Sequence, residues 1–219
     1  MKSSDSNHFA IAIDGPAASG KSTVARLLAQ RLGLVMVNSG AMYRAVTWKA
    51  LSEHIDPCDC AAVANLLHRI HIECGHDGIS STITIDGVDP GDVLRSEKVN
   101  ANVSAISAIP EVRAALIGLQ REFTQHSNVV MEGRDIGSVV FPDTPYKIYI
   151  DAAEEIRAAR RKAAGEVDSI ANRDAADSSR QTAPLVVAHG ATRLDTSDLT
   201  IDGAVDASIE ILRHQGLKV

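Results

Sequence analysis

Aromatic side chains are scarce in this chain of 219 residues, because Phe, Trp and Tyr together make up 3% of it. Proteins that bind single-stranded nucleic acid stack bases on aromatic side chains, so the composition argues against that class. Basic residues are outnumbered as well: 22 Lys and Arg stand against 28 Asp and Glu, which gives a formal net charge of −6. We therefore expect no broad surface for nucleic acid, and any phosphate site must be local.

Cysteine and long apolar runs are also rare. The three cysteines, Cys58, Cys60 and Cys74, are odd in number and lack a second Cys or His pair at zinc-site spacing. Free thiols in a reducing cytosol are the simpler interpretation. Residues 1–8 are polar, and the apolar run at 9–13 is too short for a signal-peptide core or a membrane span. We expect a cytoplasmic protein that binds no membrane and, since no heptad seam stands out, a monomer.

Short apolar segments alternate with helical patterns along most of the chain. The predicted strands of the main sheet cover residues 9–13, 34–37, 129–132, 147–151 and 193–195. Five such strands alternating with helices predict an α/β fold with a five-stranded parallel sheet flanked by helices. The length and the 45% hydrophobic content favour one domain with inserted segments over two equal domains.

Two segments depart from this alternation. Within residues 70–85 apolar and polar residues alternate on either side of glycine turns, which predicts a small antiparallel insert. Residues 165–182 are charged, show little apolar periodicity and lie between two α/β elements, so we predict a mobile lid there. The predicted division is a core at about 8–40, 126–164 and 183–219, an insert at about 41–125 and the lid at about 165–182.

The strongest motif is Gly-Pro-Ala-Ala-Ser-Gly-Lys-Ser at residues 15–22, which fits the phosphate-binding loop (P-loop) pattern between a strand and a helix. Its backbone N–H groups converge on phosphate, Lys21 places a charge near the β- and γ-phosphate oxygens, and Ser22 is suited to ligate Mg²⁺. A turn that merely links strand to helix needs neither side chain. The loop alone indicates only a nucleoside triphosphate, because switches, motors and transferases share it. The expected donor-binding residues are Gly15, Pro16, Ala17, Ala18, Ser19, Gly20, Lys21, Ser22 and Thr23.

Two further motifs follow other predicted strands, at the sheet edge where ligands of open α/β folds collect. Arg44, in the first turns of a helix, is suited to hold a second phosphate in a bidentate manner, although a solvent-facing arginine explains this segment equally well. Residues 132–135, Glu-Gly-Arg-Asp, gather charges that are costly at a buried edge unless they serve a purpose. Glu132 would orient the water shell of Mg²⁺, and Arg134 would neutralise phosphate charge during transfer. A structural ion-pair turn is the alternative.

In the predicted lid, Arg173, Asp177 and Arg180 stand four and three residues apart. This spacing puts all three on one face if the segment is helical. A solvated helix with ion pairs is the alternative, but beside a P-loop an arginine-rich lid is the better interpretation.

Taken together, these motifs resemble bacterial cytidylate kinases over nearly the whole chain. The most specific part is Gly-Arg-Asp-Ile-Gly-Ser-Val-Val-Phe-Pro-Asp at 133–143, with Ala-Pro-Leu at 183–185 and the β-rich insert as further marks. The resemblance implies a P-loop NTPase fold whose insert binds a nucleoside monophosphate (NMP). It implies direct in-line transfer of the γ-phosphoryl group of ATP, with Mg²⁺, to CMP or dCMP.

The resemblance also implies roles for individual residues. Ser104, Arg113 and Asp135 would read the cytosine edge, and the lid residues would engage ribose and phosphates. The implied substrate-binding residues are Ser39, Tyr43, Arg44, Ser104, Arg113, Arg134, Asp135, Arg173, Asp177 and Arg180, and the implied catalytic residues are Lys21, Arg134, Arg173 and Arg180. Ser22 and, through water, Glu132 would hold the metal.

The chain departs from the family pattern in places: the family often has aspartate where Asn38 and Glu132 stand, and residues 161–172 form a shorter stretch than usual. The geometry of the lid and the rate depend on these changes. Two alternative functions stay open, a P-loop kinase for another small acceptor such as UMP or AMP, and a nucleotide-binding regulatory module.

Overall fold

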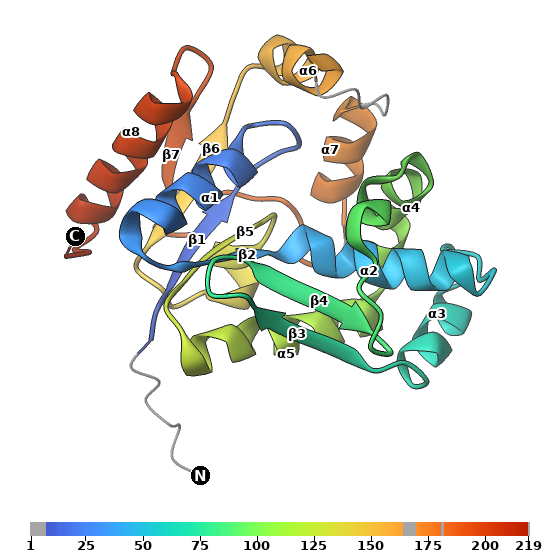
Figure 1. Ribbon diagram of the computed structural model, residues 1–219. Coiled ribbons are helices and arrows are strands. Elements are labelled where there is room, and N and C mark those ends of the chain that lie inside the picture. The colour runs from blue at the N-terminus through green and yellow to red at the C-terminus, as the bar shows by residue number, and fades with distance from the viewer. Residues whose placement is uncertain (1–7, 164–169, 181, 219) are drawn as a thin grey trace.

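The computed structural model describes residues 8–163, 170–180 and 182–218, with only the backbone of residues 170–173 (Figure 1). Within this part of the chain, the centre is a sheet of five parallel strands in the order β2-β5-β1-β6-β7. The strands are β1 (Ala10–Asp14), β2 (Val35–Asn38), β5 (Val129–Gly133), β6 (Lys147–Asp151) and β7 (Thr192–Asp195). The predicted sheet, the fold of P-loop NTPases, is confirmed.

Helices cover both faces of the sheet, because its central strand is apolar on both sides (Figure 1). Ile11 and Ile13 pack into the core formed with α1 and α8. Ala10 and Ala12 pack on the other face, where Phe123 of α5 is buried. The covering helices are α1 (Lys21–Leu32), α5 (Pro110–His126) and α8 (Ile201–His214). Burial of β1 on both faces explains why it reads as a continuous apolar run.

Local sequence explains where the first helices begin and end. Gly33 adopts a φ of 65° at the end of α1, the left-handed conformation that glycine takes readily after a helix. The Asn38 side chain accepts a hydrogen bond of 3.0 Å from the Ala41 N–H and so caps α2 (Ser39–Ser52). The Asn38 side chain therefore serves as a helix cap.

The segment between β2 and β5 has an apolar core of its own. Strands β3 (Ile72–His76) and β4 (Ser81–Ile85) pair antiparallel, as predicted. Ile83 and Ile85 pack against the surrounding helices. These elements are α2, α3 (Cys60–Leu67), the 3-10 turn η1 (Gly91–Arg95), α4 (Glu97–Ala108) and α5. The short helix α3, capped by the Asp59 side chain, was not predicted. The boundaries proposed for core, insert and lid stay a prediction.

The region predicted as a lid contains helix α7 (Ile170–Ser178), which follows α6 (Glu154–Ala163). Helix α7 ends two residues before Arg180, so the interpretation of Arg173, Asp177 and Arg180 as one helical face is wrong for Arg180. The Leu185 N–H donates to the Asp177 carbonyl at 3.0 Å, and this bond turns the chain away after the helix.

Within the described residues, no single helix is long and apolar enough to cross a membrane. Helices α4 and α5 meet that length and composition only when taken together, across a bend of 95°.

Candidate functional site

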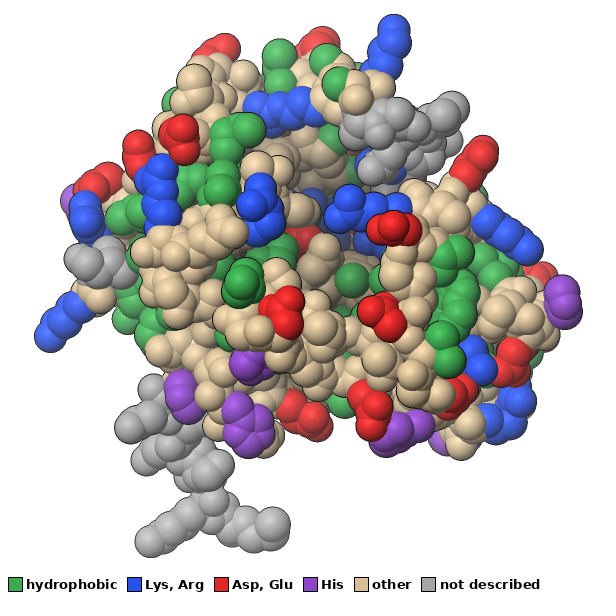
Figure 2. Space-filling model, in the orientation of Figure 1, with side chains coloured by type: hydrophobic (Ala, Val, Ile, Leu, Met, Phe, Trp, Pro, Cys, Tyr) green, Lys and Arg blue, Asp and Glu red, His purple; other side chains and the backbone are tan. Residues whose placement is uncertain are grey.

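A cavity of about 900 Å³ opens where β1, β2 and β5 end. This is the edge at which open α/β sheets collect ligands. Figure 2 shows this face hollowed near its centre, with Lys and Arg side chains beside the hollow. The predicted site residues that line the cavity are Ala17, Ala18, Ser19, Gly20, Lys21, Ser22, Thr23, Ser39, Tyr43, Arg44, Ser104, Arg113, Glu132, Arg134, Asp135, Asp177 and Arg180.

The P-loop between β1 and α1 has a geometry that its glycine requires. A Cβ atom added at Gly15 would lie 2.0 Å from the Ile150 carbonyl oxygen, so no larger residue fits there. Lys21 is only 6% exposed, and its Nζ donates to the Pro16 carbonyl at 3.0 Å. The loop thus holds an ammonium group in the wall of the cavity, beside backbone N–H groups at the start of a helix.

A hydroxyl and a carboxylate meet beside this lysine. Ser22 Oγ donates to Glu132 Oε1 at 2.9 Å, which joins the first turn of α1 to the end of β5. Mg²⁺ prefers oxygen ligands and is held by one or two protein groups together with substrate phosphates and water. Ser22 and Glu132 therefore fit the predicted magnesium site. Among the described residues there is no group of three or more His, Cys, Asp or Glu that would hold a metal without such help.

Asp14, at the end of β1, fixes the turn after β5. Its carboxylate accepts hydrogen bonds from the backbone N–H groups of Ile136 and Gly137, at 2.8 and 2.7 Å. Burial raises the pKa of Asp14 to about 6, the two hydrogen bonds oppose this rise, and the nearby Asp135 charge adds to it. The sequence analysis missed this residue. An acid that ends an apolar strand directly before a P-loop was the available signal.

The raised pKa of Asp14 predicts a pH-dependent contribution to stability. The folded protein holds this proton more tightly than the unfolded chain, whose value is 3.8. The contribution is therefore fully present below pH 3.8 and is lost as the pH rises through about 6. We expect the free energy of unfolding of the native protein, minus that of Asp14→Asn, to fall by about 2 kcal/mol between pH 4 and 7. Urea unfolding at several pH values measures this difference, and a constant difference would contradict the assignment.

The far wall of the cavity is built around a buried ion pair. Arg113 on α5 pairs with Asp135 after β5, and the two side chains are 2% and 6% exposed. Arg113 Nη1 also donates to the Ser107 carbonyl at 3.2 Å, and the guanidinium lies 5.5 Å from the centre of the Tyr43 ring. Burial raises the pKa of Asp135, and the Arg113 charge opposes that rise. The pair presents a fixed carboxylate and a fixed guanidinium to a planar polar ligand.

Arg44 lines the cavity, and this placement favours the binding interpretation over the solvent-facing one. Its Nη1 donates to the Gly40 carbonyl at 3.1 Å, and its Nε donates to Asn100 Oδ1 at 3.4 Å. Ser39 Oγ donates to the Glu132 carbonyl at 2.8 Å and so ties the start of α2 to β5. Helix α2 therefore carries its arginine at a position fixed relative to the Ser22–Glu132 contact.

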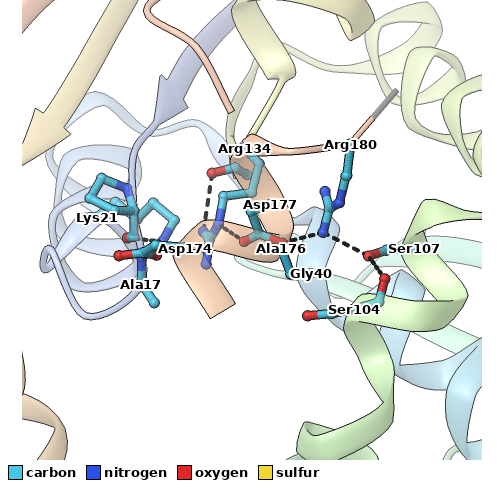
Figure 3. Close-up of polar contacts among 12 residues, drawn as sticks. Ala17, Lys21, Gly40, Ser104, Ser107, Arg134, Asp174, Ala176, Asp177 and Arg180 are labelled. Atoms are coloured by element: carbon cyan, nitrogen blue, oxygen red, sulfur yellow. Dashed lines mark hydrogen bonds and ion pairs between the residues drawn. The ribbon is translucent and has the colours of Figure 1, made fainter. Parts of the chain in front are cut away.

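Asp177 and Arg180, from the region predicted as a lid, meet the turn after β5 in one network (Figure 3). Arg134 Nε donates to Asp177 Oδ2 at 2.7 Å, and Arg180 pairs with the same carboxylate. Arg180 Nη2 also donates to Ser107 Oγ on α4 at 2.7 Å. Burial lowers the pKa of Arg180, although the Asp177 charge opposes this. The side chain of Arg173 lies outside the described residues, so its predicted role stays a prediction.

Comparison with known proteins identifies the family. A family model described as cytidylate kinase matches residues 11–214. The chain is 41% identical over 216 residues to a cytidylate kinase of Streptomyces avermitilis, which covers 94% of this chain and 93% of that protein. It is 39% identical over 218 residues to a cytidylate kinase of Clostridium botulinum, over 94% of this chain and 99% of that protein. The chain belongs to the cytidylate kinase family.

Membership of the cytidylate kinase family confirms the resemblance inferred from the motifs and the prediction of a kinase. The structure adds cavity residues that the sequence analysis missed. Arg160 on α6 donates to the Ser19 carbonyl at 3.2 Å and to the Thr196 carbonyl at 2.8 Å. Thr196 Oγ1 donates to the same Ser19 carbonyl at 3.0 Å. Arg161, largely buried, lines the cavity as well. The available signal was the pair of adjacent arginines near the end of α6.

The cytidylate kinase cavity also has an apolar side. Leu199 and Ile201 stand at the start of α8, are 39% and 58% exposed and line the same cavity as the P-loop. Exposed aliphatic side chains next to a phosphate-binding loop suit the flat face of a nucleobase. The sequence analysis did not single out these residues, because isolated aliphatic residues at a helix start carry no local signal.

Proposed function

We propose that this member of the cytidylate kinase family transfers the γ-phosphoryl group of MgATP to CMP or dCMP. The observation that carries the proposal is that one cavity holds both halves of a two-substrate site. The P-loop and Lys21 form one wall, and the buried Arg113–Asp135 pair forms another. A regulatory module that only binds a nucleoside triphosphate would have no use for the second wall.

Charge supports an acceptor that carries a phosphate. Between the lid and the turn after β5, the guanidinium groups of Arg113, Arg134 and Arg180 face the carboxylates of Asp135 and Asp177. Among these five described side chains, three are positive and two are negative, and most of them are buried. Burying unbalanced charge is costly unless an anion joins it, and a nucleoside monophosphate supplies one.

The proposed reaction is an in-line attack by an oxygen of the CMP phosphate on the γ-phosphorus of ATP, with ADP as the leaving group. A phosphate dianion is already nucleophilic, so the site needs no covalent intermediate and no strong general base. Catalysis is then positioning and neutralisation of charge, for which Lys21, Arg134 and Arg180 are placed. Ser22 and Glu132 would hold Mg²⁺, which when bound would shield the charge of the donor phosphates.

The Arg113–Asp135 pair suits recognition of cytosine. The exocyclic N4 amino group of cytosine is a donor and requires an acceptor such as the Asp135 carboxylate, whereas O2 and N3 are acceptors and require donors such as Arg113. A site built to make these hydrogen bonds rejects a base that leaves them unmade. Ser104 lies on the same wall. This is the reason we place CMP and dCMP ahead of UMP and AMP.

The experiment that tests the proposal is coupled release of ADP from MgATP with CMP, dCMP, UMP and AMP supplied separately. Lys21→Ala serves as the blank. We expect turnover to be fastest with CMP or dCMP and to vanish in the blank. Faster turnover with UMP or AMP would assign another acceptor, and equally slow hydrolysis with every nucleotide would leave only a nucleotide-binding protein. Cytoplasmic location and a monomeric state stay predictions of the sequence.

A further inference from the structure

A single residue of the P-loop, Ala17, is held from both sides by an ion pair between two other helices. The Ala17 N–H donates to Asp174 Oδ1 of α7 at 2.9 Å, as Figure 3 shows. Arg157 Nη1 of α6 donates to the Ala17 carbonyl at 3.2 Å, and the same nitrogen pairs with Asp174 Oδ2. Arg157 is fixed further by a bond of 3.0 Å from its Nε to the Ala152 carbonyl. We call this arrangement the Ala17 clamp.

The clamp lies beside the cavity and acts on the P-loop from outside. Ala17 lines the cavity, whereas Arg157 and Asp174 are not among the described residues that do. Their side chains are 12% and 18% exposed, so the ion pair is largely shielded from water. A contact in this position acts on a ligand only through the loop that it holds.

The loop needs such support, because its backbone is strained at the next residue. Ala18 adopts a φ of 58°, a left-handed conformation that costs a residue with a Cβ atom about 1–2 kcal/mol. A neighbouring peptide fixed at both its N–H and its carbonyl restrains this conformation. The residues that follow along the loop line the cavity, and this restraint keeps their backbone in the conformation that a bound phosphate would meet.

We propose that Asp174 is a positioning residue for phosphoryl transfer: with Arg157 it fixes helix α7 against the P-loop and thereby aligns the donor site with Arg134 and Arg180. This inference rests on the proposed function. The physical link is short, because Asp177, which holds Arg134 and Arg180, stands three residues after Asp174 on the same helix. A shift of α7 relative to the loop moves both contacts together.

Steady-state kinetics of three variants test the proposal. Asp174→Ala removes both contacts, Asp174→Asn keeps an acceptor for the Ala17 N–H but removes the ion pair, and Arg157→Gln removes the other partner. We expect kcat with CMP to fall by about 10-fold to 100-fold in Asp174→Ala, since small displacements of reacting groups cost this much. The KM values for ATP and CMP should change by less than about 3-fold, because neither residue is among the described residues that line the cavity. The Asp174→Asn loss should lie between those of native protein and Asp174→Ala.

A double-mutant cycle distinguishes the clamp from two independent effects. The Asp174→Ala/Arg157→Gln double variant should lose no more activity than the worse single variant, because both residues act through one ion pair. If the loss of kcat in the double variant equals the product of the two single losses, the proposal is overturned. A lower KM for ATP at unchanged kcat would overturn it as well, since it would mean that the Asp174 carboxylate competes with a donor phosphate for the Ala17 N–H. A fall in kcat per folded molecule of Asp174→Ala, at a melting temperature within about 4 °C of the native value, would exclude a merely structural role for Asp174.

Asp206→Asn is the matched control, because Asp206 forms an exposed ion pair with Arg31 and neither residue is among those that line the cavity. It should leave kcat unchanged. Amide hydrogen exchange supplies a readout that does not depend on the proposed reaction. The Ala17 amide should exchange at least about 10-fold faster in Asp174→Ala than in the native protein. If the native protein fails to phosphorylate CMP, the proposed function falls while the exchange result still decides whether the clamp exists. Unchanged exchange would overturn the clamp itself.

Discussion

Replacing Lys21 with alanine is expected to lower kcat for phosphoryl transfer to CMP by about 10³-fold. The Lys21 ammonium is buried in the cavity wall, where its charge is poorly screened by water. Negative charge develops on the leaving oxygen of ATP as the bond to the γ-phosphorus breaks, and a fixed positive charge in a low dielectric stabilises it strongly. Coupled ADP release at saturating CMP and MgATP measures this loss.

The Lys98→Ala variant is the control for this substitution. Lys98 is an exposed lysine of α4, so its removal changes the net charge equally without touching the P-loop. We expect its kcat to stay within about 2-fold of the native value, as is usual for surface substitutions away from a site. A Lys21→Ala variant that retained a tenth or more of native activity would show that the loop is not the donor site.

The main sheet was predictable because its signals are local. Strand β1 is a continuous apolar run, and the P-loop directly after it fixes both the end of the strand and the start of α1. Gly15 belongs to that local pattern, although its reason is not local. The atom that excludes a Cβ there is the carbonyl oxygen of Ile150, which belongs to β6. Sequence spacing identified the glycine, and only the fold explains it.

The missed parts of the site depend on contacts between residues far apart in the chain. Asp14 accepts hydrogen bonds from the backbone N–H groups of Ile136 and Gly137, which follow it by 122 and 123 positions. Asp174 accepts one from the N–H of Ala17, which precedes it by 157 positions. No periodicity or turn signal predicts such a contact, because in the sequence Asp14 and Asp174 look like ordinary acidic residues and their partners are backbone N–H groups. The error at Arg180 has the same origin: its spacing fits a helix, but α7 ends at Ser178, and the residue bonds to Ser107 of α4 as well as to Asp177.

The Asp14 carboxylate and the Ala17 clamp act on the same loop from its two sides. Asp14 ends the strand that enters the P-loop and fixes the turn that carries Arg134 and Asp135. Asp174 joins Ala17 to the helix that carries Asp177. The P-loop is thus connected to both groups of proposed acceptor-binding residues by carboxylates that are not among the described residues lining the cavity. A change in either connection should alter kcat more than KM.

Replacing Asp135 with alanine is expected to lower the free energy of unfolding by about 3–5 kcal/mol. The substitution leaves the Arg113 guanidinium buried, at 2% exposure, without its carboxylate partner. A buried charge that loses its partner keeps its full desolvation cost, whereas an intact pair offsets much of it. For a chain of this size, such a loss corresponds to a melting temperature lower by about 10 °C. Thermal unfolding followed by circular dichroism measures it.

Two comparisons make this result specific to the buried pair. Asp151→Ala removes the carboxylate of a pair with Arg193, in which the side chains are 31% and 64% exposed, and a hydrogen bond of 2.9 Å from the Ala152 N–H, so its cost should stay below about 2 kcal/mol. Arg113→Met combined with Asp135→Ala removes both charges and should recover part of the stability lost in Asp135→Ala. Equal losses in Asp135→Ala and Asp151→Ala would show that burial does not govern the pair. The double variant can also recover stability and yet lose the preference for CMP over UMP. In that case the buried charges serve base recognition rather than folding. The unpaired charge then explains the instability of Asp135→Ala, and the missing hydrogen-bond partners explain the lost selectivity.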